Sequence, residues 1–145
     1  MKKYYYINEL YHHGIKGMKW GVRRYTNPDG TLTDKGRRHY SRQVARLSRL
    51  GNRASVADAR YEQYKDTFNA IDRAYRSKGP MAYGRWYSSS STQSQKQYLS
   101  QLGRKAVRST ERVKKLMNKL SSELKASDYT LGYDVINEQY NLIKR

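Results

Sequence analysis

The sequence predicts a mainly α-helical protein: a long antiparallel helical hairpin, a short C-terminal helix, and a small N-terminal segment that is irregular apart from one β-hairpin. Two stretches, residues 40–75 and 99–124, repeat apolar side chains at steps of three and four, the spacing of one helix face. Residues 77–92 between them carry Gly, Pro and five consecutive hydroxyl residues. Such a segment turns the chain, so the two helices should pack antiparallel within one domain.

The N-terminal segment, residues 1–33, is rich in glycine and aromatic residues. The run 20–26 meets the turn residues Asn27-Pro28-Asp29-Gly30 and then the β-prone run 31–33, a pattern that predicts a small hairpin. Thr33 is suited to cap a helix, with Asp34 in the first turn facing the positive end of the helix dipole. We therefore expect a docking segment at 1–33 followed by a helical domain at 34–145.

Three helices are expected in that domain. The first spans about 34–76, roughly 65 Å if unbroken, although Gly51-Asn52 could dent it. The second spans about 93–126, capped by Thr92 or a neighbouring serine. Gly132 marks a break, and the apolar spacing from Tyr133 to Ile143 predicts a third, short helix at 133–143.

The charge balance points to an anionic partner. Lys and Arg number 30 against 12 Asp and Glu, a formal net charge of +18, and so large an excess costs self-repulsion unless a partner neutralises it. The core is expected to be thin and to rely on the 15 tyrosines. No stretch approaches the length of a membrane span and no apolar signal core follows the start, so we expect no membrane partner and no secretion.

The basic residues follow one face of each of the two long predicted helices. The first basic ridge recurs at steps of three and four, and no carboxylate lies between Lys35 and Ala57; it consists of Arg38, Arg42, Arg46, Arg49 and Arg53. The second basic ridge repeats the arrangement on the other long helix, with Arg104, Arg108, Arg112, Lys115 and Lys119. Arginine-dominated ridges favour sequence-independent contacts to phosphates, so nucleic acid, DNA or RNA, is the expected ligand.

Other chemistry has little support. The absence of cysteine excludes disulfides, thiolate catalysis and Cys-based zinc sites. The acidic row Asp58, Glu62 and Asp66 is better explained by pairing with cations of the facing helix, or of a second subunit in a homo-oligomer, than by metal binding. The loop 83–87 could stack nucleobases but more often such rings plug the end of a helical hairpin. We expect no enzyme, no metal and no cofactor.

Part of the N-terminal segment resembles a motif of proteins from tailed bacteriophages and prophages. The motif string is His13-Gly14-Ile15-Lys16-Gly17-Met18-Lys19-Trp20-Gly21-Val22-Arg23-Arg24. The resemblance continues through the turn at 27–30 to Gly36 and Tyr40. The resemblance implies a portable protein-docking element found beside capsid, portal and head-assembly genes. Its docking residues would be His13, Gly14, Ile15, Lys16, Gly17, Met18, Lys19, Trp20, Gly21, Arg23 and Arg24. The expected partners are then phage structural proteins, and the expected location is the virion, or the host cytoplasm during assembly.

Together these features predict a non-enzymatic virion or head-assembly protein that docks through its N-terminal motif and contacts packaged nucleic acid through its basic helices. Two alternatives remain open. One is a phage-encoded inhibitor of host defence, of the anti-CRISPR type, whose basic face competes for a nucleic-acid channel. The other is a generic nucleic-acid-binding protein with no role in a particle.

Overall fold

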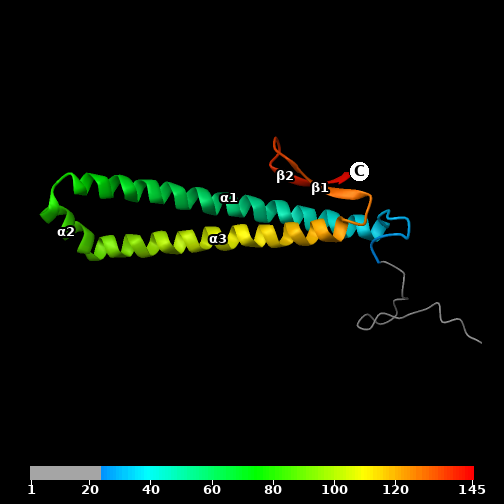
Figure 1. Cartoon of the computed structure of the whole chain (residues 1–145), viewed down its shortest axis with the longest axis horizontal. Helices are drawn as coiled ribbons and strands as arrows, with labels where there is room; N and C mark the ends of the chain where they lie inside the picture. The colour runs from blue at the N-terminus through cyan, green and yellow to red at the C-terminus, as the bar shows by residue number, and fades with distance from the viewer. Residues whose placement is uncertain (1–23) are drawn as a thin grey trace, which may run out of the picture. The chain divides into compact units, whose positions relative to one another are not determined.

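A computed structural model describes residues 24–145, which form three helices and one two-stranded sheet: α1 (Asp34–Arg76), α2 (Pro80–Ser88), α3 (Ser90–Leu124), β1 (Tyr129–Asp134) and β2 (Gln139–Lys144) (Figure 1). These residues fall into two compact units, one made of residues 24–45 and 119–145 and the other of residues 46–118. The predicted mainly α-helical class is confirmed, and the first predicted helix has the same bounds as α1.

Helix α1 begins at a hydroxyl cap. The Thr33 Oγ1 accepts a hydrogen bond from the Gly36 amide at 2.9 Å, which satisfies one of the free N–H groups of the first turn. Asp34 lies in that turn and pairs with Arg37. The helix continues without a break through Gly51 and Asn52, so the dent that these residues could have caused is absent from α1. A glycine there costs about 1 kcal/mol of helix propensity, which the packing of a 43-residue helix offsets.

Gly79 and Pro80 end one helix and start the next. Gly79 has a φ of 93°, a conformation that favours glycine, and Pro80 follows at the first position of α2, where its missing N–H costs no hydrogen bond. The predicted turn region therefore contains a nine-residue helix that periodicity did not reveal. The Ser89 Oγ then accepts from the Thr92 amide at 3.2 Å, so a serine caps α3, as one of the two predicted alternatives had it.

The unit at 46–118 is the predicted antiparallel helical hairpin, with α1 and α3 side by side and α2 between them in the chain (Figure 1). Its buried side chains are few, and most are small: Leu47, Ala54, Thr92 and Ala106. The helices approach closely at Gly103, where an added Cβ would lie 3.1 Å from Cε2 of Tyr61. A thin core of this kind leaves the tyrosines of the seam half-buried, as the composition indicated.

The unit at 24–45 and 119–145 packs the N-terminal turn against the end of α3. Thr26 and Leu32 form an antiparallel bridge around the turn, which confirms the predicted hairpin for residues 24–33, while residues 20–23 lie outside the described part. Gly30 has a φ of 89°, and its carbonyl accepts a hydrogen bond from the Asp128 amide at 3.1 Å. Leu32 is buried in this unit together with Tyr40, Val44, Leu120 and Leu124.

The predicted third helix at 133–143 is wrong. Residues 129–144 form the antiparallel hairpin β1–β2, with Tyr133 opposite Tyr140. The Asp134 Oδ1 accepts from the Ile136 and Asn137 amides at 2.9 and 3.1 Å, and this turn directs the chain back along itself. Gly132, interpreted as a break, lies inside β1, where a Cβ would come within 2.1 Å of Cδ1 of Ile143.

Candidate nucleic-acid interface

A groove between α1 and α3 in the unit at 46–118 gathers four cations. We call it the basic groove; its volume is about 700 Å³, and it is lined by Asn52, Arg53, Val56, Ala57 and Arg60 of α1 and by Tyr98, Gln101, Leu102, Lys105, Ser109 and Arg112 of α3. The cations are Arg53, Arg60, Lys105 and Arg112. No aspartate or glutamate is among the lining residues, so the groove presents charge of a single sign.

The four cations form two pairs that face each other across the groove. The contacts of Tyr61 with Gly103 and of Tyr64 with Tyr98 set the antiparallel register of the two helices. In that register Arg60 comes level with Lys105, and Arg53 comes level with Arg112. Each pair is separated from the other by seven residues, or roughly 10 Å at the rise of an α-helix.

These cations are available to a ligand. All four side chains are exposed. The ion pairs found among residues 24–145 use other partners: Asp34 with Arg37, Glu62 with Lys65, Asp72 with Arg76, and Glu123 with Lys119. Each of these pairs lies within one helix at a spacing of three or four, and none of them involves a cation of the basic groove.

The other predicted cations have different surroundings. Arg104 and Arg108 line a second groove of the same unit, where Asp58 is also present. Lys119 lies 3.8 Å from a carboxylate oxygen of Glu123. The remaining members of the two basic ridges are exposed on their helices: Arg38, Arg42, Arg46, Arg49 and Lys115. Of the ten predicted residues, only Arg53 and Arg112 therefore lie in the basic groove.

Sequence reasoning missed Arg60, Lys105 and Tyr98 as groove residues. A signal for the two cations exists, because Arg60 continues the first basic ridge beyond Arg53 by steps of four and three, and Lys105 lies two such steps before Arg112. Whether these residues line the same groove depends on the register between α1 and α3. The residue pattern of either helix alone does not determine that register.

One member of the acidic row on α1, Glu62, pairs with a neighbouring cation of the same helix. Glu62 holds the Lys65 ammonium, with its Oε2 at 2.8 Å, and this hydrogen bond raises the pKa of Lys65. The partner of Glu62 lies on the same helix, whereas the prediction placed it on the facing helix or on a second subunit. From Arg24 onward, no three His, Asp or Glu side chains come together in a way that could hold a metal ion.

The aromatic residues of α2 pack against the neighbouring helix. The Trp86 ring stacks on Tyr75 with centroids 4.9 Å apart and an interplanar angle of 8°, and it also meets Phe68 at 5.9 Å. The Tyr83 hydroxyl donates to Asp72 at 3.0 Å, and burial raises the pKa of that hydroxyl. These contacts favour the plug at the end of the hairpin over base stacking for Trp86.

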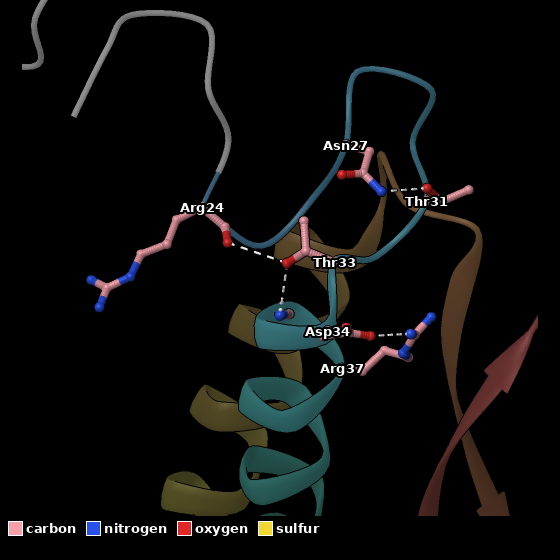
Figure 2. Close-up of polar contacts among 7 residues, drawn as sticks. Arg24, Asn27, Thr31, Thr33, Asp34 and Arg37 are labelled. Carbon is pink, nitrogen blue, oxygen red and sulfur yellow. Dashed lines mark hydrogen bonds and ion pairs between the residues drawn. The ribbon is translucent and has the colours of Figure 1, made fainter.

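The predicted docking segment is described only at its end. His13, Gly14, Ile15, Lys16, Gly17, Met18, Lys19, Trp20, Gly21 and Arg23 lie outside the described residues. Figure 2 shows the part that follows: the Thr33 hydroxyl donates to the Arg24 carbonyl at 3.3 Å while it caps α1. The Tyr25 ring stacks on His39 at 4.2 Å. Residues 24–33 are thus anchored to the first turns of α1.

A family of unknown function, DUF7211, matches residues 5–27. No curated protein and no solved structure matches the chain. The matched segment overlaps the N-terminal motif and ends at the turn that leads into α1, and it does not include the helices that line the basic groove.

Within residues 24–145, no helix combines the length and the apolar character that crossing a membrane requires.

Proposed function

We propose that this protein is a non-enzymatic nucleic-acid-binding protein that uses the basic groove to contact the phosphate backbone without reading its sequence. The observation that carries the proposal is the groove itself, with four exposed cations and no carboxylate among its lining residues. Three of the four cations are arginines, whose planar forks pair with phosphate oxygens through two hydrogen bonds. Contacts of this kind carry affinity and depend steeply on salt.

The spacing of the cations favours a polymer over a small anion. The pair Arg53 and Arg112 lies roughly 10 Å along the helices from the pair Arg60 and Lys105. A ligand with several phosphates along one chain can reach both pairs, whereas an isolated phosphate engages one pair and leaves the other without a partner. The repulsion among four like charges is a cost in the free protein that a bound polyanion removes.

Charge removal tests the proposal. The groove variant carries Arg53→Gln, Arg60→Gln, Lys105→Gln and Arg112→Gln. Its matched control loses the same charge at exposed cations that line neither groove of the helical hairpin, through Lys35→Gln, Arg73→Gln, Lys114→Gln and Lys125→Gln. Affinity for a labelled oligonucleotide is measured against salt for both variants.

We expect the groove variant to bind more weakly, with a slope of log K against log salt that is smaller by up to about 0.7–0.9 for each lost phosphate contact. The control should retain most of the wild-type slope. Equal losses in the two variants would mean that only net charge matters and would remove the groove from the account.

We further propose that the N-terminal motif brings the protein into phage particles during their assembly. This part rests on the resemblance of residues 11–36 to proteins of tailed phages. Because Leu32 is buried and Thr33 caps α1, the deletion that tests it should stop before Arg24. Mass spectrometry of purified particles should then find the full chain and lack the truncated one, while circular dichroism remains helical. Incorporation of the truncated chain would contradict docking through the motif.

A further inference from the structure

Tyr98 is the one aromatic residue among those that line the basic groove. Binding of phosphates by the four cations does not explain why an aromatic ring lies in this groove. Its side chain is 49% exposed. Its ring meets Tyr64 edge to face, with centroids 5.0 Å apart and an interplanar angle of 78°. A single perpendicular contact covers at most one face of the Tyr98 ring. Because about half of the residue is exposed and it lines the groove, part of the ring surface is accessible to a flat group that enters the groove.

The position of Tyr98 continues the line of cations along α3. Tyr98, Lys105 and Arg112 follow each other at intervals of seven residues, so they lie on one face of the helix at steps of roughly 10 Å. Val56 and Leu102 line the same groove and supply apolar surface beside the charges. The groove thus combines a charged track with an aromatic platform at one end.

That combination is typical of sites for single strands. Unpaired bases stack on aromatic side chains while the backbone follows a positively charged groove, and stacking tolerates any sequence because every base has a flat face. Bases inside a duplex are already stacked on their neighbours and do not reach a protein ring without being extruded. We propose that the basic groove binds a single-stranded polynucleotide, with phosphates on the two cation pairs and one base stacked on Tyr98. This inference rests on the proposed function and gives it a ligand class.

Three oligonucleotides of about 12 nucleotides test the inference with the full chain: a single strand, the matching duplex, and an abasic single strand that keeps the phosphates but lacks bases. Fluorescence anisotropy at one fixed salt concentration gives each affinity. We expect the wild type to prefer the single strand to the duplex, and the abasic strand to lose about tenfold in affinity. Tyr98→Leu should lower affinity for the single strand by about tenfold and leave the abasic strand and the duplex unchanged.

Two further variants separate stacking from folding. Tyr98→Phe keeps the ring and should bind the single strand within about threefold of the wild type. Tyr133→Leu removes a ring of similar exposure, 52%, on β1 and should change nothing. Tyr98→Leu binding like the wild type, or a wild-type preference for the duplex, would overturn the inference while leaving the groove as a phosphate site. Failure of the groove variant to lose affinity would instead overturn the proposed function.

Discussion

Replacing Gly36 with alanine tests how residues 24–33 are attached to α1. Gly36 is buried in the first turn of the helix, directly against the backbone of Tyr25. An added Cβ would lie 2.0 Å from the Tyr25 carbonyl oxygen, far inside any tolerated contact. Because that neighbour is backbone and not the end of a flexible side chain, we expect the turn segment to move away from the helix.

The size of the effect follows from the contacts that the movement breaks. The Thr33 amide donates to the Tyr25 carbonyl at 3.1 Å and the Thr33 hydroxyl donates to the Arg24 carbonyl at 3.3 Å, each worth about 1 kcal/mol. The stack of Tyr25 on His39 adds about 0.5–1.5 kcal/mol. Alanine recovers up to about 1 kcal/mol of helix propensity. The free energy of unfolding should therefore fall by roughly 1.5–3.5 kcal/mol.

Gly84→Ala is the matched control. Gly84 is also helical, but nothing lies within 4 Å of a Cβ added there. The same substitution should therefore raise the free energy of unfolding by up to about 1 kcal/mol. Urea denaturation followed by circular dichroism measures both variants, and NMR of the Thr33 amide reports the local contact. Stability of Gly36→Ala equal to or above that of the wild type would refute the close packing of Tyr25 on α1.

Three further predictions concern the core and the charges. Leu120→Ala should lower the free energy of unfolding by about 2–5 kcal/mol in urea denaturation, because Leu120 is 1% exposed, and a loss below about 1 kcal/mol would contradict its burial. The groove variant should unfold at an equal or higher temperature than the wild type, since it removes repulsion without breaking an ion pair; clear destabilisation by calorimetry would mean that the groove cations support the fold. The Arg76 guanidinium, and secondarily the Tyr83 hydroxyl, hold the pKa of Asp72 below its ordinary value of 3.8. The stabilisation by Asp72 should therefore be complete above pH 3.8 and disappear as the pH falls through the lowered pKa of Asp72. Urea midpoints of wild type and Asp72→Asn should differ at neutral pH and converge once acid has protonated Asp72, whereas a constant difference would contradict the pairing.

The helices could be predicted from sequence because their ends are marked by local chemistry. Thr33 and Asp34 define the start of α1, and Gly79-Pro80 stops it within a few residues of Arg76. These signals act within one or two turns, so they can be read without knowledge of packing. The helix α2 was hidden because Gly84 suggested a loop, whereas Pro80 at its first position favours a helix.

The C-terminal hairpin could not be recognised by helical spacing. Tyr133, Ile136, Tyr140 and Ile143 step by threes and fours, and this pattern is shared by a short amphipathic helix and by two strands joined by a turn. The deciding feature is Asp134, whose carboxylate accepts from two backbone amides and a side-chain amide of the turn. An aspartate in that role competes with helix formation, a signal that periodicity ignores.

The candidate site was only half accessible from the sequence. The basic ridges identified Arg53 and Arg112, because both follow the spacing of an exposed helix face. These two residues line the same groove as Arg60, Lys105 and Tyr98 only because of the register between α1 and α3. The contact of Gly103 with Tyr61 helps to set that register, and it involves residues far apart in the chain.

Protection of Lys105 from acetylation tests the location of the nucleic-acid site most directly. Lys105 lies in the basic groove, while Lys114 is exposed on the same helix and is not among the residues that line it. Brief acetylation with and without a bound oligonucleotide, followed by mass spectrometry of the peptides, compares the two side chains in one sample. We predict that the oligonucleotide slows acetylation of Lys105 severalfold and leaves Lys114 unchanged. Equal protection of both lysines, or protection of Lys114 alone, would contradict binding in the groove.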